Sequence, residues 1–225
     1  MVKAVLFDMD GVLVDVFLSY RLTIKRAVEY FTDRKISFPQ VQEYKNRGGV
    51  NNDWYLTESI LKDYGKKIEM EKIIDVFQEI YLGENFNGLI RNEKWLLDIK
   101  VLEIIQKDFK LGIVTGRPKK EACYTLKRFG VENFFPVLIT MDDLSPEKAK
   151  PEPFGIELAL KQSKAHEAYY IGDTVDDIEA ACRANIIPIG VVFGNKNYEK
   201  QENLLLKSGA HRVLRDINDI LEVLK

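Results

Sequence analysis

Residues 4–17, AVLFDMDGVLVDVF, place two aspartates two positions apart directly after an apolar run. The run from Val2 to Phe7 is short and rich in residues that favour strands, so it predicts a buried β-strand. Asp8 and Asp10 would then stand together at the carboxyl end of that strand. Carboxylates this close repel each other, and burial raises the cost. The stretch therefore predicts that something elsewhere in the chain compensates the two charges.

Strands and helices alternate in short units over the second half of the chain. Further strands are expected at 110–115, 137–140, 168–172 and 187–192. Helical patterns separate them, which indicates a parallel sheet with right-handed crossovers. The first strand has to join the same sheet because it has no other partner. The predicted fold class is α/β, with a Rossmann-like parallel sheet at its core.

A helical segment interrupts this pattern after the first strand. Between residues 15 and 90 apolar residues follow helical spacing, and no convincing strand is found. The expected helices are 19–32, a second from Pro39, a third capped by Asn51, Asn52 or Asp53, and 69–81. We therefore predict a core domain of residues 1–14 and 91–225, with residues 15–90 inserted as a helical domain.

Composition narrows the class of protein. The chain has 225 residues, of which 46% are hydrophobic and 30% charged, the balance of a globular protein. Lys and Arg (33) nearly cancel Asp and Glu (35), so no charge excess points to nucleic acid or an anionic membrane. Neither a signal peptide nor an apolar stretch of membrane-spanning length is expected. Cys123 and Cys182 are predicted to be buried free thiols, which favours a reducing compartment such as the cytoplasm.

Polar residues follow each predicted strand. In an open parallel sheet, ligands bind beyond the carboxyl ends of the strands. The residues found there are Asp8, Asp10, Thr115, Gly116, Arg117, Asp142, Asp143, Asp173, Asp176 and Asp177, together with Lys150 in the loop SPEKAKPEP. We expect these groups to converge on one edge of the sheet.

Three of the carboxylates, those of Asp8, Asp10 and Asp173, are predicted to hold a metal ion. Lys150 is the obvious cation near them, and one lysine does not balance three acids. A hard divalent cation with oxygen ligands would resolve the repulsion, and Mg²⁺ is the usual choice. Thr115, its neighbouring backbone N–H groups and Lys150 are then expected to hold phosphoryl oxygens.

These parts predict a phosphoryl-transfer mechanism. Asp8 attacks phosphorus and forms an aspartyl-phosphate. Asp10 protonates the leaving alkoxide and then takes a proton from the water that hydrolyses the intermediate. The expected substrate is a small phosphorylated metabolite.

Four short motifs in order, DMDGVL, VTG, KPEP beginning at Lys150, and GDTVDD, resemble those of the haloacid dehalogenase superfamily, in its phosphatase branch. The resemblance covers essentially the whole chain, because the helical insertion is similar to the small cap of that family. The stretches SYRLTIKRAVEYF and RGGVNNDW are similar to a subgroup near the phosphoglycolate phosphatases.

The resemblance implies a role for each motif residue. It makes Asp8 the nucleophile, Asp10 the acid and base, Thr115 and Lys150 the phosphoryl binders, Asp173 a metal ligand, and Asp177 with Asp176 the acids behind it. Haloacid dehalogenases usually lack an acid at the position of Asp10, so dehalogenation is disfavoured.

Four other residues are weaker candidates for binding the substrate. Gly116 and Arg117 lie beside the expected phosphoryl pocket, although Arg117 could simply flank the start of a helix. Arg47 and Asn52 surround a Gly-Gly pair in the insertion and would set specificity if that domain closes over the site. A surface turn followed by a helix cap explains the same two residues.

Other functions remain open on the sequence alone. A phosphomutase of the same family would use the same residues with water excluded. A phosphoacceptor switch, from a different class, would carry the phosphoryl group on an aspartate to bias a partner interface. Receiver domains of that kind have about half this length and no cap, which argues against the switch. A non-catalytic metal-binding scaffold is disfavoured because every motif position is kept.

Overall fold

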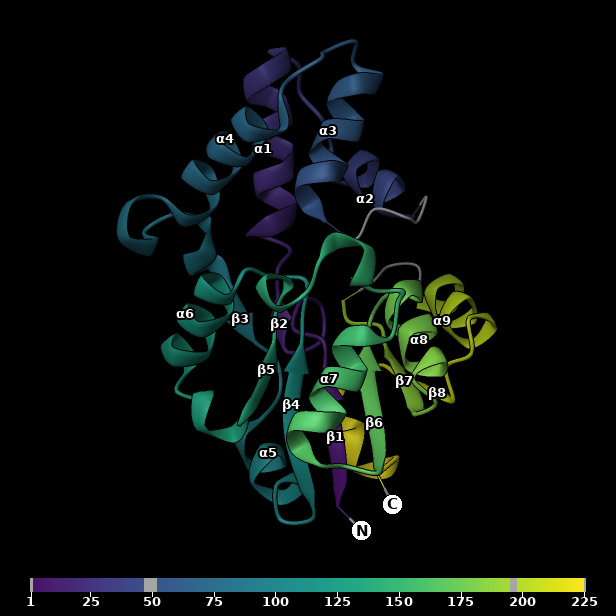
Figure 1. Ribbon diagram of the computed structural model, residues 1–225. Helices are drawn as coiled ribbons and strands as arrows, with labels where there is room; N and C mark the ends of the chain where they lie inside the picture. The colour runs from purple at the N-terminus through teal and green to yellow at the C-terminus, as the bar shows by residue number, and fades with distance from the viewer. Residues whose placement is uncertain (1, 47–51, 195–197, 225) are drawn as a thin grey trace. The chain divides into compact units, whose positions relative to one another are not determined.

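A six-stranded parallel sheet runs through the larger of two units into which the chain divides (Figure 1). The computed structural model describes residues 2–46, 52–194 and 198–224. The larger unit comprises Met1–Val14 and Trp95–Lys225, and the smaller one comprises Asp15–Lys94. The chain passes between them through two short paired strands, β2 (Val14–Asp15) and β3 (Lys94–Trp95).

The six strands of the main sheet lie in the order β5-β4-β1-β6-β7-β8. They are β1 (Lys3–Phe7), β4 (Phe109–Val114), β5 (Val137–Ile139), β6 (Glu167–Gly172), β7 (Ile187–Val191) and β8 (Arg212–Leu214). All neighbouring pairs are parallel, which confirms the predicted α/β fold with a Rossmann-like core. β8 was not expected from the sequence, because three residues at the edge of a sheet give too short an apolar run.

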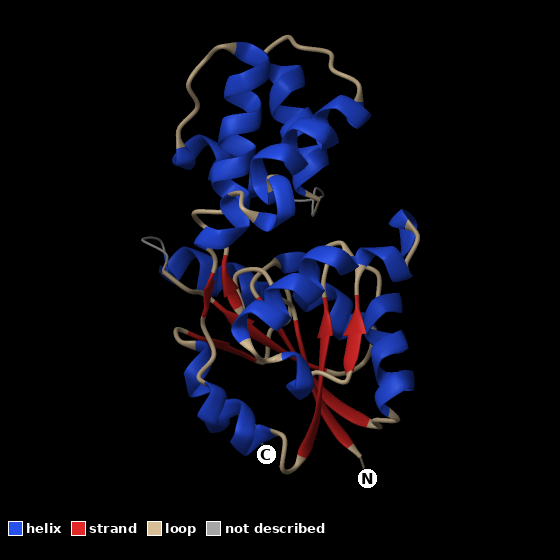
Figure 2. Ribbon diagram, turned by 90° about the vertical axis from the view of Figure 1, so that its left-hand side faces the viewer, coloured by secondary structure: helices blue, strands red, loops and turns tan. Residues whose placement is uncertain are grey.

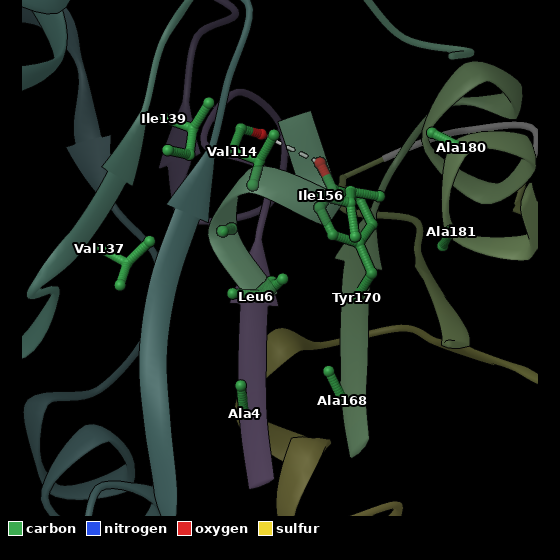
Figure 3. Close-up of a cluster of buried hydrophobic side chains, with 11 residues drawn as sticks. Ala4, Leu6, Val114, Val137, Ile139, Ile156, Ala168, Tyr170, Ala180 and Ala181 are labelled. Carbon is green, nitrogen blue, oxygen red and sulfur yellow. Dashed lines mark hydrogen bonds between the residues drawn. The ribbon is translucent and has the colours of Figure 1, made fainter. Parts of the chain in front are cut away.

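Helices lie on both sides of this sheet (Figure 2). They are α5 (Ile99–Ile105), α6 (Lys119–Phe129), α7 (Phe154–Ser163), α8 (Val175–Arg183) and α9 (Tyr198–Lys207). Alternate residues of a strand face the same side, so Ala4 and Leu6 of β1 share a face with Tyr170 of β6. Ile156 of α7 and Ala180 of α8 pack against that face in one buried cluster (Figure 3).

The two cysteines correct one expectation. Cys123 on α6 and Cys182 on α8 are free thiols as predicted, but both are exposed rather than buried. Both cysteines lie in helices as predicted, but the buried stripe of each helix is carried by the neighbouring Ala122 and Ala181. Each cysteine lies one position further round its helix, on the side that faces water. In the described ranges we find no helix with the length and hydrophobicity of a membrane span.

The smaller unit consists of α1 (Tyr20–Thr32), α2 (Phe38–Asn46), α3 (Asp53–Asp63) and α4 (Met70–Leu82). Its core is apolar and aromatic, with Tyr20 stacked on Tyr81 at 4.2 Å between ring centroids. The buried Glu93 accepts hydrogen bonds from Tyr81 Oη at 2.8 Å and from Ser19 Oγ at 3.2 Å. These bonds tie Glu93 to the helices, which explains why the division falls at Lys94–Trp95 and not at residue 90.

The predicted cap of the third helix is confirmed at Asn52. Its side-chain oxygen accepts a hydrogen bond from the backbone N–H of Trp54 at 2.8 Å, at the N-terminus of α3. The oxygen is therefore engaged within the helical unit, which gives no support to the predicted substrate contact of Asn52. Arg47, the other predicted contact in this loop, lies outside the described residues.

Candidate active site

The central strands end at one level, and this places the motif residues together. Phe7 of β1 is in register with Ile113 of β4 and Ile171 of β6. Pairing continues one residue further, because the N–H of Asp8 donates to the carbonyl of Ile171 at 2.8 Å. The N–H of Thr115 likewise donates to Ile139, at 2.9 Å. The backbone therefore fixes Asp8 and Thr115 before any side chain takes part.

Lys150 reaches into the centre of this edge. Its Nζ lies 2.6 Å from Asp8 Oδ1, 2.6 Å from Asp177 Oδ1 and 3.0 Å from Tyr170 Oη. An ammonium group has three N–H donors, and these three acceptors can take all of them. The lysine side chain is 9% exposed. Burial alone would lower the pKa of Lys150, but the carboxylates of Asp177 and Asp8 outweigh it and raise the pKa well above its usual value.

Asp8 lies between this lysine and the other acids. Burial raises the pKa of Asp8 to about 7, with further increases from the charges of Asp177 and Asp10, while Lys150 opposes the shift. The backbone N–H of Asp10 donates to Asp8 Oδ2 at 3.0 Å. Each oxygen of the Asp8 carboxylate therefore has a fixed donor, and the group still gains from any further positive charge.

We predict a pH-dependent contribution of Asp8 to stability in the metal-free protein. Because the folded-state pKa is raised to about 7 from 3.8, the contribution is full below pH 3.8 and is lost as pH rises through about 7. The expected loss is on the order of 1–4 kcal/mol. Melting curves of wild type and Asp8→Asn in chelator, from pH 4.5 to 8, measure it as the change in their difference. A constant difference across this range would contradict the prediction.

Asp177 performs two tasks with one carboxylate. Its Oδ2 accepts from Thr174 N at 3.1 Å and from Thr174 Oγ1 at 2.7 Å, and the N–H of Asp177 donates back to that hydroxyl. This capping box starts α8. The other oxygen, Oδ1, accepts from Lys150. The neighbouring Asp176 is partly buried, and burial followed by the charge of Asp177 raises its pKa.

Asp8, Asp173 and Asp177 form the acidic cluster that fits a metal ion. Each offers one carboxylate oxygen, and these oxygens all lie within 4.8 Å of one another. The predicted ligand set was Asp8, Asp10 and Asp173, so Asp177 stands in this cluster where Asp10 was expected. Three carboxylate oxygens are a donor set that suits a hard divalent cation.

Two glycines allow the acids to approach each other. Gly11 has a φ of +81°, and a Cβ there would lie 2.2 Å from Asp173 Oδ2. A Cβ on Gly172 would lie 2.2 Å from the Cβ of Asp177. A side chain at either position would push an acid of the cluster away, so both positions require glycine.

Arg117 holds Asp10, which corrects its predicted role. The guanidinium is 1% exposed and donates to Asp10 Oδ1 from Nε at 2.6 Å and also from Nη2. Its Nη1 donates to Thr125 Oγ1 on α6 at 3.0 Å. A guanidinium buried on these partners does not fit the predicted contact with a substrate. Its neighbour Gly116 is exposed at the strand end.

Comparison with known proteins identifies the family. A sequence model described as haloacid dehalogenase-like hydrolase matches residues 5–191. The chain belongs to this family.

Similar proteins and solved structures show the extent of the likeness. An imidazoleglycerol-phosphate dehydratase from Phytophthora nicotianae is 34% identical over 85% of the chain, which spans 43% of that protein. Pyrophosphatase PpaX from Bacillus pumilus is 28% identical over 99% of the chain and 96% of its own length. The crystal structure of a predicted phosphoglycolate phosphatase from Haemophilus somnus matches with a TM-score of 0.79, at 23% identity over 100% of this chain and 98% of that one. The last comparison shows the shared fold.

Asp142 and Asp143 follow β5 as expected, but their carboxylates have local roles. Asp143 accepts hydrogen bonds from the backbone and the hydroxyl of Thr140, at 2.9 and 2.8 Å, and forms a capping box. Asp142 accepts from the backbone N–H of Lys119 at 2.8 Å, at the start of α6. Both carboxylates are therefore engaged by neighbouring residues at the start of local helices.

Tyr170 is the site residue that sequence reasoning missed. Its hydroxyl donates to the carbonyl of Val114 at 3.0 Å (Figure 3) and accepts from Lys150 Nζ. Burial raises the pKa of this tyrosine well above its usual value, so it stays neutral. The signal in the sequence was a tyrosine two positions before Gly172, on the core face of a strand. A buried hydroxyl on such a face needs a partner.

Tyr170→Phe should lower both stability and any activity that depends on Lys150. The change removes the hydroxyl that contacts both the carbonyl of Val114 and Lys150. Because Lys150 Nζ also lies 3.3 Å from that carbonyl, we expect the cost of a lost hydrogen bond, about 1 kcal/mol. We expect a lower melting temperature and, once a substrate is known, a decrease in kcat of about tenfold. Tyr30→Phe, at an exposed tyrosine of α1 in the smaller unit, is the control and should change neither. Equal effects of the two substitutions would argue against a role for the Tyr170 hydroxyl.

Proposed function

We propose that the chain is a Mg²⁺-dependent phosphomonoester hydrolase that acts on a small phosphorylated metabolite through an aspartyl-phosphate. The observation that carries this proposal is the position of Asp8 at a strand end, where it contacts Lys150 and forms an acidic cluster with Asp173 and Asp177. Asp10 lies two residues after Asp8, the proposed nucleophile, and its side chain is 32% exposed. The names of relatives such as pyrophosphatase PpaX support a substrate with a phosphoryl bond.

The first step transfers the phosphoryl group to the protein. One oxygen of the Asp8 carboxylate bonds to phosphorus as the bond from phosphorus to the ester oxygen breaks. The carboxyl of Asp10 gives its proton to the departing alkoxide, which leaves as an alcohol. Lys150 and Thr115 hold phosphoryl oxygens as negative charge develops on them.

The second step regenerates the enzyme. Water attacks phosphorus, its proton passes to the Asp10 carboxylate, and the bond from phosphorus to the Asp8 oxygen breaks to release inorganic phosphate. Mg²⁺ bound by Asp8, Asp173 and Asp177 would neutralise charge between the carboxylate and the phosphoryl group. Asp176 is adjacent in sequence to Asp177 of this cluster. We propose that its charge influences the cluster without binding the metal.

We extend the proposal to the smaller unit and to the location of the protein. The helical unit is proposed to act as a cap that selects the substrate, as its place in the sequence after the first strand supports. The free thiols of Cys123 and Cys182 support a reducing compartment such as the cytoplasm.

Phosphate release from a panel of phosphorylated metabolites tests the function. We expect release that requires Mg²⁺, falls at least about 100-fold in chelator and returns when Mg²⁺ is restored. Acid-quenched enzyme should carry one phosphoryl group on the peptide that contains Asp8, detected by mass spectrometry. Turnover that chelator leaves unchanged would contradict the metal, and release without a phosphorylated peptide would contradict the intermediate.

A further inference from the structure

A positive charge lies buried behind the exposed face of Asp10. Arg117 follows β4 and is 1% exposed, whereas the side chain of Asp10 is 32% exposed. The guanidinium contacts Oδ1 of this carboxylate through both Nε and Nη2. The guanidinium therefore holds the Asp10 carboxylate through Oδ1 from the protein side, while the Asp10 side chain as a whole stays partly exposed.

Arg117 is itself anchored at two further points. Its Nη1 donates to the hydroxyl of Thr125 at 3.0 Å, and Thr125 is fully buried in α6. Its backbone N–H donates to Thr115 Oγ1 at 3.2 Å. One residue thus connects the helix behind the site, the hydroxyl proposed to bind the phosphoryl group and the carboxylate proposed to move protons.

We propose that Arg117 is the positioning residue for proton transfer by Asp10. The inference rests on the proposed function and assigns Arg117 a task that neither substrate binding nor helix initiation describes. By holding Oδ1, the guanidinium restricts rotation of the Asp10 side chain and fixes the direction in which the carboxyl group gives and takes its proton. Thr125 restricts the guanidinium in turn.

The contacts made by the side chain at position 117 require arginine rather than lysine. The planar guanidinium donates to Asp10 along one edge and to Thr125 from its other end. A lysine ammonium is a single point donor on a flexible stem and cannot span both partners at these distances. Arg117→Lys therefore keeps the charge and removes the positioning.

Proton transfer from Asp10 matters most when the leaving group is a strong base. An alkyl phosphate releases an alkoxide that must be protonated as the bond from oxygen to phosphorus breaks. The p-nitrophenolate ion is a stable leaving group and departs without that proton. Misplacing Asp10 should therefore slow cleavage of an alkyl phosphate far more than cleavage of p-nitrophenyl phosphate. A general loss of folded enzyme would slow both equally.

The test compares kcat/KM for these two substrates in Arg117→Lys, Arg117→Met and Thr125→Val. For the arginine variants we expect a decrease of about 100-fold with the alkyl phosphate and less than about threefold with p-nitrophenyl phosphate. Thr125→Val is nearly isosteric and leaves the site residues in place. Its kcat/KM should decrease about fivefold more for the alkyl phosphate than for p-nitrophenyl phosphate. Thr57→Val, at an equally buried helical threonine in the smaller unit, is the control and should show no bias. Equal losses for both substrates, or no loss, would overturn the proposal.

A crystal structure of Arg117→Met separates this proposal from the proposed function. If wild-type protein hydrolyses no phosphate ester, the proposed function fails, and the structure alone decides the role of Arg117. We expect the Asp10 carboxylate to occupy a new or second orientation in the variant. An Asp10 that keeps its single orientation without the guanidinium would overturn the positioning role.

Discussion

Asp8→Asn should reduce turnover of any phosphorylated substrate by at least about 1,000-fold. The amide has nearly the same shape as the carboxylate and occupies a position that backbone pairing with Ile171 already fixes. It lacks the negative charge needed to attack phosphorus, so no phosphorylated protein can form. The loss should appear in kcat, because Lys150 and Thr115 remain to bind the phosphoryl group.

Asp142→Asn is the matched control for this substitution. Asp142 also follows a strand of the same sheet, but its carboxylate accepts from the backbone N–H of Lys119 and is exposed. We expect kcat within about threefold of wild type, because the substitution changes only a local helix start. Both rates are measured as phosphate release under identical Mg²⁺ concentrations.

Two outcomes would change the interpretation. Turnover that survives Asp8→Asn would mean that water attacks phosphorus directly and that Asp8 only binds. Wild-type protein that accumulates phosphate on Asp8 but releases none would favour the phosphomutase or the phosphoacceptor switch. Addition of a second phosphorylated metabolite then distinguishes these two, because only a mutase passes the group on.

The sheet could be predicted because its signals are local. Apolar runs bounded by turn residues mark β1, β4, β5, β6 and β7 within a few residues. The parallel order follows from the crossovers between them. β8 has three residues and no apolar run. Its place beside β7 depends on long-range pairing, which the spacing of apolar residues along the sequence does not reveal.

The positions of the candidate residues could be predicted, but their contacts could not. Asp8 and Lys150 are separated by 142 positions in sequence, and Asp10 and Arg117 by 107. Strand ends show which loops meet, but not which side chain reaches which oxygen. Arg117 looked available to a substrate because nothing in the sequence indicates that Thr125 and Asp10 bury it.

Lys150→Met is expected to have the second large effect, on stability as well as activity. The substitution leaves Asp8 and Asp177 as buried carboxylates without the cation that each now contacts at 2.6 Å. Breaking a buried ion pair by removing one partner costs about 3–5 kcal/mol. It also removes a proposed phosphoryl binder, so kcat should decrease at least about 100-fold. Lys148→Met, an exposed lysine of the same loop, should change neither quantity noticeably.

The pH and metal dependence of this destabilisation identify its cause. Protonation removes the uncompensated charge, so the stability difference between wild type and Lys150→Met should be largest near pH 8 and shrink towards pH 5. Mg²⁺ should shrink it at pH 8, because a cation bound by Asp8, Asp173 and Asp177 replaces the missing charge in the folded state only. Denaturant unfolding at both pH values, with Mg²⁺ and with chelator, measures the four differences. A destabilisation that is the same under all four conditions would mean that Lys150 contributes packing alone, because only a charge imbalance responds to both protons and metal.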